Sequence, residues 1–486
     1  MARSFVVKRE EFSRRVVDYL NPMDLLLTHG FYLSEDPKEL AVMKPYAPLG
    51  ILYLSSHLRK KGIQVEVYDA TFGSREELFK MLQDGPPSVL GIYGNLMTRQ
   101  SVLSIVSVAR AAGWTVILGG PEPPAYAAEY LAAGAHAIVE GEGEITVEEL
   151  LAGIRTEGVR SFERISGLIF RGENGSLVRT PSRSLIPDLD AQPWPDRERI
   201  DMERYMRVWR DHHGVSSLSV ITARGCAYRC RWCSHSTYGQ THRRRSSKGV
   251  ADEVEWLLRR YQPEMLWMAD DVFTIHHGWI KDYAREMKHR GIRIPFECIT
   301  RADRLNPQAA DALAELGCFR VWIGSESGSQ RILDAMGREV KVEQVCDSIR
   351  LCRERGIQSG MFLMWGYEGE EVSDVEATVA HVKASLPDAF LTTVAYPIKG
   401  TPYHDAVASR LISSSEWSRS TDRDVRIRGR RSGTFYQYAD RLLKSEVALQ
   451  KIRDGVPVES RTAEDLRNQI DEARRGLYAA AAEVES

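Results

Sequence analysis

Two successive series of short apolar runs, each alternating with amphipathic helical patterns, constrain the fold of this chain most strongly. Strands that alternate with helices pair in parallel, because each crossover returns the chain to the same edge of the sheet. The fold class is therefore α/β. The first series has five strand-like runs, at 24–28, 65–68, 89–93, 115–118 and 137–139. The second has six, at 218–222, 265–269, 296–300, 320–324, 361–366 and 391–396.

These series predict the domain organisation. The first predicts a doubly wound, flavodoxin-like domain at 23–155. The second fits a partial (βα)6 barrel at 216–403 better than an open sheet, although the sequence leaves its closure open. An Asn-Gly turn and four prolines predict a linker with a hairpin at 156–215. Residues 1–22 predict an N-terminal arm. The helical C-terminal region, 404–486, is either a cap that faces the substrate or a packing appendage.

Composition excludes several classes of protein. The chain has 486 residues and a net charge of −2, so it lacks the basic field of a nucleic-acid-binding protein. The sequence contains no stretch that predicts a membrane span or a signal peptide. Seven cysteines, three of them grouped, argue against a disulfide framework and for a reducing compartment. We therefore expect a cytoplasmic protein with a small-molecule substrate.

Three cysteines follow the first strand of the second series at C-x3-C-x2-C spacing. They are Cys226, Cys230 and Cys233. Thiolates are soft ligands that suit iron–sulfur clusters or zinc. Because no fourth ligand lies nearby in the sequence, one coordination position stays open, as a catalytic metal centre requires. The spacing predicts a catalytic metal site rather than a packing role.

Glycine-rich turns follow the third, fourth and fifth strands of the first series, at 94–99, 119–122 and 140–144. Glycine lets a ligand approach the backbone closely and tolerates positive φ. In doubly wound sheets, ligands bind at the carboxyl ends of the strands. Three such turns favour a ligand site over ordinary connections, but they do not identify the ligand.

The cysteine motif, with Trp232 before its last cysteine, resembles that of the radical S-adenosylmethionine (SAM) superfamily. Together with the residues at 48–50, 119–122 and 141–144, it is similar to the radical SAM enzymes that have a cobalamin-binding domain. This group includes methyltransferases acting on unactivated carbon or phosphorus and the anaerobic magnesium-protoporphyrin monoester cyclase. The resemblance covers roughly 23–403.

The resemblance implies roles for residues at the ends of the barrel strands. The three cysteines would hold a 4Fe–4S cluster whose fourth iron binds the amino and carboxylate groups of SAM. Trp232 would lie beside the adenine. Asp270 and Asp271 would contact the methionyl amino group and Arg301 the methionyl carboxylate. Ser325 and Glu326 would contact the ribose or the methionine of the cofactor.

The resemblance also implies that cobalamin binds at the glycine-rich turns. Many cobalamin proteins place a histidine below cobalt in a D-x-H-x-x-G motif, but the turn at 94–99 reads Gly-Asn-Leu-Met-Thr-Arg. Cobalamin would then bind without histidine, and the 96–98 loop would face the lower side of cobalt. The implied contacts are Gly94, Leu96, Met97, Thr98, Gly119, Gly120, Pro121, Glu122, Glu140 and Gly141.

The implied activity is methylation of an unactivated carbon, by a 5′-deoxyadenosyl radical that removes hydrogen and methylcobalamin that supplies the methyl group. A radical SAM cyclase, ring-contracting or oxidative enzyme is an alternative that the sequence does not separate. A non-catalytic sensor that binds the cluster and cobalamin is another. The family resemblance also implies an electron donor such as flavodoxin or ferredoxin.

Overall fold

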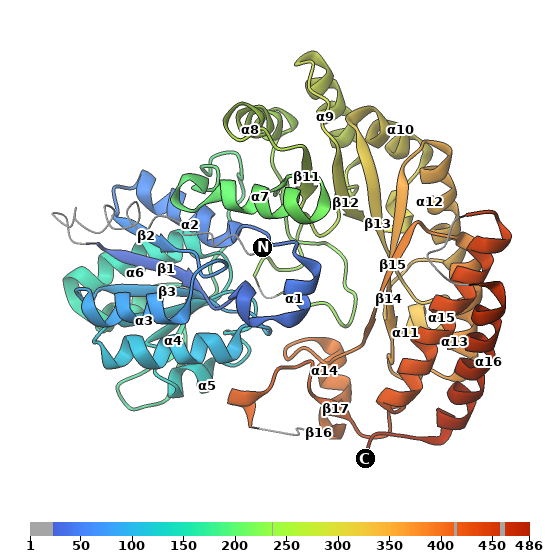
Figure 1. Ribbon diagram of the computed structural model, residues 1–486. Helices are drawn as coiled ribbons and strands as arrows, with labels where there is room; N and C mark the ends of the chain where they lie inside the picture. Colours follow the sequence, from blue (N-terminus) through green and yellow to red (C-terminus); the bar gives the residue numbers. More distant parts are fainter. Residues whose placement is uncertain (1–22, 236, 413–415, 457–461) are drawn as a thin grey trace, which may run out of the picture.

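The computed structural model of the protein describes residues 23–235, 237–412, 416–456 and 462–486, and contains two separate large sheets (Figure 1). The expected N-terminal arm at 1–22 lies outside the described residues. The α/β fold class is confirmed. The domain boundaries drawn from the sequence stay predictions, although the pairing of the strands bears on where each sheet ends.

The N-terminal sheet has the order β2-β1-β3-β4-β5-β6-β7, and its first five strands are parallel. This is the flavodoxin-like order expected from the sequence. Apolar side chains fill the core on both faces of the sheet. The strands are β1 (Leu25–His29), β2 (Val65–Tyr68), β3 (Val89–Tyr93), β4 (Thr115–Gly119) and β5 (Ala137–Val139). The helices are α1 (Pro37–Val42), α2 (Leu49–Lys60), α3 (Arg75–Asp84), α4 (Arg99–Ala111), α5 (Ala127–Ala132) and α6 (Gly143–Glu157).

The predicted hairpin forms, but it belongs to this sheet rather than to a free linker. β6 (Leu168–Arg171) pairs antiparallel with β5, and β7 (Leu177–Arg179) pairs with β6. Ile169 packs into the core on one face and Phe170 into the core on the other. Burial on both faces fixes the hairpin to the sheet edge.

Helix α7 (Met202–His213) was not predicted. It lies in the stretch at 156–215 that we interpreted as a linker with a hairpin. Its apolar residues Met202, Tyr205, Met206 and Trp209 are buried and recur at helical spacing. That period marks an amphipathic helix and could have been found in the sequence.

The second sheet contains six parallel strands in the order β15-β14-β13-β12-β11-β8, with β8 and β15 at its edges. Because the edge strands do not pair, the barrel is partial. Its strands are β8 (Ser217–Val220), β11 (Met265–Met268), β12 (Phe296–Thr300), β13 (Cys318–Glu326), β14 (Gln358–Trp365) and β15 (Ala389–Val394). Its helices are α8 (Ser247–Arg260), α9 (His277–His289), α10 (Pro307–Leu316), α11 (Gln330–Ala335), α12 (Val342–Glu354) and α13 (Val372–Ser385).

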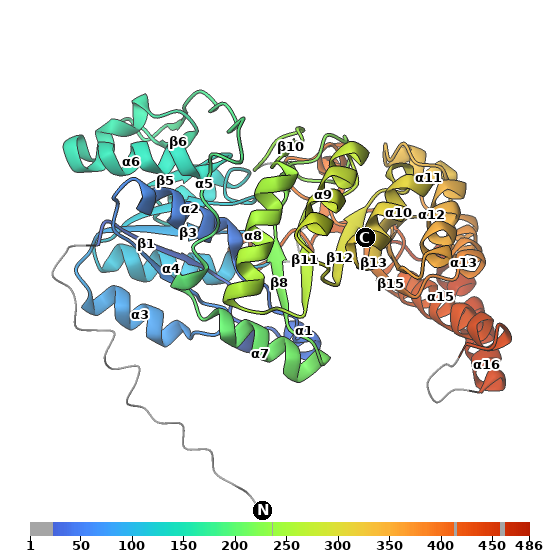
Figure 2. The same ribbon diagram turned by 90° about the horizontal axis from the view of Figure 1, so that it is seen from above.

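The C-terminal region divides into two parts. Helices α15 (Gly433–Arg453) and α16 (Ala463–Ala479) pack together, and α15 contacts α13 in the outer helix layer (Figure 2). The helical pair is therefore a packing element on the outside of the barrel. Before it come α14 (Pro402–Val407), β16 (Leu411–Ile412) and β17 (Arg426–Ile427), and residues 416–424 between those two strands reach the N-terminal domain. Of the helices described, none is long and apolar enough to cross a membrane.

Glu370 follows β14, and its buried carboxyl should make the stability of the protein depend on pH. Burial raises the pKa of its carboxyl from 4.5 to about 8. One oxygen accepts a hydrogen bond from Gly366 N at 2.6 Å, and Oε1 has no partner among the described residues. Between these two pKa values the unfolded chain releases a proton that the folded chain keeps, so stability falls as pH rises. Glu370→Gln keeps the acceptor and cannot ionise.

We expect Glu370→Gln to raise the free energy of unfolding by roughly 1–3 kcal/mol at about pH 8 and by much less at about pH 5. Urea denaturation of wild type and variant at both pH values measures the difference. An equal effect at the two pH values would show that ionisation of Glu370 does not limit stability.

Candidate functional site

The three cysteines lie in one loop, which we call the cysteine loop and which the structure describes at residues 225–235 and 237–242. It connects two antiparallel strands of two residues each, β9 (Ala223–Arg224) and β10 (Arg243–Arg244), which follow β8 in the chain. Gly225 has φ +83°, and a Cβ there would lie 2.3 Å from the carbonyl oxygen of Thr241. Only glycine lets the two ends of the loop approach so closely. Cys230 is buried, Cys226 half-buried and Cys233 exposed.

Two arginines converge on the buried thiol. Arg301, at the end of β12, places Nη1 3.8 Å from Cys230 Sγ, and Arg338 places Nη1 3.7 Å from the same sulfur. The Arg301 guanidinium also lies 3.6 Å from the centroid of the Tyr228 ring and donates to Asp303 at 2.9 Å. Sequence reasoning missed Arg338, because it follows the short helix α11 and belongs to no strand-end motif.

The thiols have the donor chemistry that a 4Fe–4S cluster requires. Desolvation by the surrounding protein raises the pKa of Cys226, and partial desolvation together with Cys230 and Asp271 raises that of Cys233 to about 12. Iron must therefore displace these protons on binding. Within the described ranges, no three Cys, His, Asp or Glu side chains are grouped as ligands of one metal ion. A cluster does not need such a group, because its thiolates bind separate irons.

Two of the predicted carboxylates lie near the thiols. Asp271 is exposed, and both Asp271 and Glu326 act on the Cys233 thiol electrostatically. Partial desolvation by the surrounding protein and the neighbouring Asp270 raise the pKa of Asp271, and burial raises that of Glu326. Glu326 has φ +61° and lies 3.9 Å from Arg338 Nε. This backbone conformation is strained for a glutamate and is typical of functional sites.

The structure gives Asp270 and Ser325 other partners. The Asp270 carboxylate accepts from Thr222 N at 2.7 Å and pairs with Arg244 at 2.8 Å, so it holds the end of β8. Ser325 Oγ lies 3.2 Å from His381 Nε2 in α13. Ser325 therefore faces helix α13, whereas Glu326, at a register shift in the pairing of β13 with β14, lies beside Arg338 and acts on the Cys233 thiol. Neither Asp270 nor Ser325 reaches the thiols.

Trp232 is half-buried and packs on a cluster of apolar side chains from α11, β14 and α14, which includes Leu333, Met364 and Tyr403. Its backbone neighbour Arg231 accepts a hydrogen bond from Tyr403 N at 2.9 Å through its carbonyl. Trp232 therefore fixes the cysteine loop to the far side of the barrel from β8. Its predicted contact with adenine stays a prediction.

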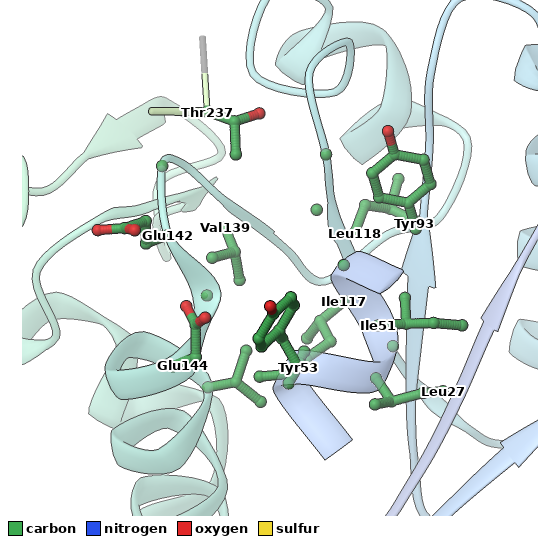
Figure 3. Close-up of a pocket in the computed structure, with 18 of the residues that line it drawn as sticks. Leu27, Ile51, Tyr53, Tyr93, Ile117, Leu118, Val139, Glu142, Glu144 and Thr237 are labelled. Carbon is green, nitrogen blue, oxygen red and sulfur yellow. The ribbon is translucent and has the colours of Figure 1, made fainter. Parts of the chain in front are cut away.

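A cavity lies at the carboxyl ends of the N-terminal strands (Figure 3). Its volume of about 120 Å³ is below the roughly 300–1,000 Å³ of a whole small-molecule or cofactor site, so it can hold only part of a large ligand. Of the predicted cobalamin contacts, Gly119, Gly120 and Gly141 line it. At Gly119 an added Cβ would meet only Val139, at 3.9 Å, so a side chain would project into the cavity. The apolar walls include Leu27, Ile51, Ile117, Leu118 and Val139.

The other predicted cobalamin contacts do not line this cavity. Thr98 is buried and hydrogen-bonds Asn95, whereas Met97 is 50% exposed. Glu122 pairs with Arg99, and Glu140 pairs with Arg179. The remaining three, which also lie outside the cavity walls, are Gly94, Leu96 and Pro121.

Several residues that line the cavity were missing from the predicted set. Tyr53 comes from α2, Glu142 and Glu144 from the start of α6, and Arg224 and Tyr238 from the second domain. The two glutamates belong to the glycine-rich turn at 140–144. The sequence predicted a ligand site at this turn but no role for these two side chains. Arg224 directly precedes the Gly-Cys pair, but its direction could not be read from the sequence.

Comparison with known proteins assigns both halves of the chain. Residues 220–382 match the radical SAM superfamily, and residues 41–151 match the B12-binding domain. The first range contains the cysteine loop and most of the barrel, and the second contains most of the cavity walls. These domains imply a 4Fe–4S cluster, SAM and cobalamin as cofactors.

Similar proteins include an uncharacterized methyltransferase of Pyrococcus horikoshii, 30% identical over 390 residues that cover 78% of this chain and 82% of the relative. The anaerobic magnesium-protoporphyrin IX monomethyl ester cyclase of a Synechocystis strain is 26% identical, over 75% of this chain and 74% of the relative.

A solved structure with the same fold is that of the radical SAM methyltransferase TsrM of Kitasatospora setae with cobalamin and a [4Fe-4S] cluster bound. It superimposes with a TM-score of 0.70 over 94% of this chain and all of that one, at 20% identity. Together with the two domain matches and the 30% identical relative, this similarity shows that the chain belongs to the radical SAM enzymes that carry a B12-binding domain.

Proposed function

We propose that this protein is a cobalamin-dependent radical SAM methyltransferase that acts on an unactivated carbon of a small molecule. The observation that carries the proposal is the position of the cysteine loop. Its thiols lie near Asp271, Glu326 and Arg301 of the barrel, while Thr237 and Tyr238 of the same loop line the N-terminal cavity. One loop thus adjoins both sites at which the chemistry would take place.

The residues around the loop have definite tasks in this proposal. Cys226, Cys230 and Cys233 would hold the 4Fe–4S cluster, and the exposed Asp271 carboxylate would accept the SAM ammonium group in place of Asp270, whose oxygens are already engaged. Arg301 and Arg338 would supply positive charge beside the Cys230 sulfur. Bound there, the cluster and SAM supply a carbon-centred radical and cobalamin supplies a methyl group.

The cavity would take an apolar part of cobalamin, and Gly119, Gly120 and Gly141 would let the cofactor approach the backbone. The glycine at 120 has φ +106°, and its position is crowded by Gly94 O and Tyr93, so no side chain fits. Thr237 and Tyr93 place hydroxyl groups toward the rim of the cavity (Figure 3).

A cyclase or another radical SAM reaction without methyl transfer is the second candidate, and the similarity to the Synechocystis cyclase favours it. The products separate the two. Anaerobically reconstituted protein with reductant and cobalamin should convert SAM to 5′-deoxyadenosine and S-adenosylhomocysteine together if it is a methylase. A cyclase should form only the first. If the protein forms neither product, the result supports the alternative of a non-catalytic sensor.

Filling the cavity should separate ligand binding from folding. Gly119 does not have positive φ, and a leucine there would extend into the empty volume. We expect Gly119→Leu to keep its far-ultraviolet circular dichroism and its cluster while it binds hydroxocobalamin about ten-fold or more weakly, since overlap worth roughly 1.4 kcal/mol costs a factor of ten. Equilibrium dialysis measures the affinity.

Gly433→Leu is the matched control. Gly433 begins α15, an added Cβ there would meet no atom within 4 Å, and the residue does not line the cavity. Its affinity for cobalamin should equal that of the wild type. Unchanged affinity in Gly119→Leu would place cobalamin elsewhere.

A further inference from the structure

The cysteine loop is fixed at both ends to the other domain. Arg224 in β9 is opposite Arg243 in β10, so the two residues close the base of the loop. Arg224 Nη1 lies 2.8 Å from Glu142 Oε1, and Arg243 Nη1 lies 2.9 Å from Glu142 Oε2. Glu142 precedes α6 of the N-terminal domain as its N-cap residue. A single carboxylate therefore holds both ends of the loop that carries the cysteines.

Arg224 makes a second ion pair, to Glu144 at 2.6 Å. The side chains of Arg224, Glu142 and Glu144 are each at least 93% buried. Burial alone would lower the pKa of Arg224, but the two carboxylates raise it above its usual value. The guanidinium carbon also lies 5.1 Å from the centroid of the Tyr53 ring and 5.6 Å from that of the Tyr238 ring. Breaking a buried pair on one side leaves an uncompensated charge, so this contact defines one position of the loop.

The same residues form a wall of the cavity. Arg224, Thr237 and Tyr238 line it from the second domain, and Tyr53, Glu142 and Glu144 line it from the first. Figure 3 shows the two glutamates on one side of the cavity and Thr237 above it. A Cβ on Gly141 would lie 3.8 Å from Thr237 O, so the loop backbone reaches the cavity. The cavity is complete only when the cysteine loop is in place.

We infer that the cysteine loop is part of the binding site for the cavity's ligand, with Arg224 as a positioning residue that couples occupation of the cavity to the order of the loop. This inference rests on the proposal that the ligand is cobalamin. Coupling is reciprocal: cobalamin that contacts Thr237 and Tyr238 stabilises the loop, and an ordered loop strengthens cobalamin binding by the same factor. Couplings of this kind are typically about 5- to 150-fold.

Alkylation of the cysteines in cluster-free, full-length protein measures the order of the loop independently of catalysis. Iodoacetamide is added with and without saturating hydroxocobalamin, and mass spectrometry follows the modification of Cys226, Cys230 and Cys233. Cobalamin should slow alkylation in the wild type by about five-fold or more. In Arg224→Met, at a cobalamin concentration that saturates the variant, this protection should disappear, and the affinity for cobalamin should fall by a similar factor.

Arg179→Met is the control, because Arg179 pairs with Glu140 beside the same turn but its side chain is 49% exposed. It should keep the protection. Tyr238→Ala is the second variant if Arg224→Met does not fold: it removes part of the cavity wall without touching the ion pairs, and cobalamin should bind it more weakly. Cobalamin that binds wild type without protecting the thiols overturns this inference alone. Wild type that binds no cobalamin overturns the proposed function as well.

Discussion

Cys230→Ala should abolish the iron–sulfur absorbance and all cleavage of SAM. Cys230 is the buried member of the three, and its sulfur contacts two guanidinium groups, at 3.8 Å from Arg301 Nη1 and 3.7 Å from Arg338 Nη1. Alanine removes one cluster ligand and also the group that would bear negative charge beside the two arginines. With one of three thiolates missing, the cluster has no complete set of protein ligands.

Iron analysis and the visible spectrum after anaerobic reconstitution measure the first effect; wild type should hold about four iron atoms per chain and the variant close to none. Release of 5′-deoxyadenosine measures the second. Cys346→Ala is the matched control, since this half-buried thiol of α12 contacts His381 Nδ1 at 3.5 Å, outside the cysteine loop. SAM cleavage retained in Cys230→Ala would contradict the assignment of the cluster.

The sequence predicted the backbone of the site well because its signals are local. Most strands of both sheets are short apolar runs, and the cysteines follow β8 as expected. Side-chain direction was the weaker part. Ser325 and Glu326 are neighbours at the end of β13, and the sequence could not tell which faces the loop; the pairing of Ser325 with His381 decides it. The sequence likewise could not tell which of the neighbours Asp270 and Asp271 faces the loop; in the structure Asp270 binds the end of β8.

Contacts between segments far apart in the chain could not be predicted from local sequence patterns. The sequence predicted Glu122 as a ligand-binding residue because it follows Gly119-Gly-Pro. In the structure its carboxylate pairs with Arg99 at 2.5 Å and accepts a hydrogen bond from the hydroxyl of Tyr130 at 2.7 Å. The third member of that set, Asp422, lies some 300 positions later in the chain. No periodicity links such residues, so the role of the C-terminal region stayed open.

Arg99 is the centre of that set. It is 1% exposed, pairs with Glu122 and with Asp422 at 2.9 Å, and donates to Ser420 O at 2.7 Å. The rings of Tyr126 and Trp417 lie 4.4 and 5.0 Å from its guanidinium carbon. One cation thus joins the turns after β3 and β4 to residues 417–422 of the C-terminal region, and Asp422 in turn accepts a hydrogen bond from Lys399 N at 3.0 Å.

Arg99→Met should destabilise the protein by about 3–5 kcal/mol, because it leaves the buried carboxylates of Glu122 and Asp422 without their cation. The denaturation midpoint in urea measures the loss. Adding Asp422→Asn should recover part of it, since one of the two unpaired charges is then removed. Arg285→Met is the control: Arg285 pairs with Asp282 but is 79% exposed, and such surface pairs contribute about 0–1 kcal/mol. If Arg99→Met costs no more than this control, residues 416–424 do not hold the C-terminal region to the N-terminal domain through charge. If the loss is large and Asp422→Asn offsets part of it, the second half of the chain stabilises the glycine-rich turns beside the cavity.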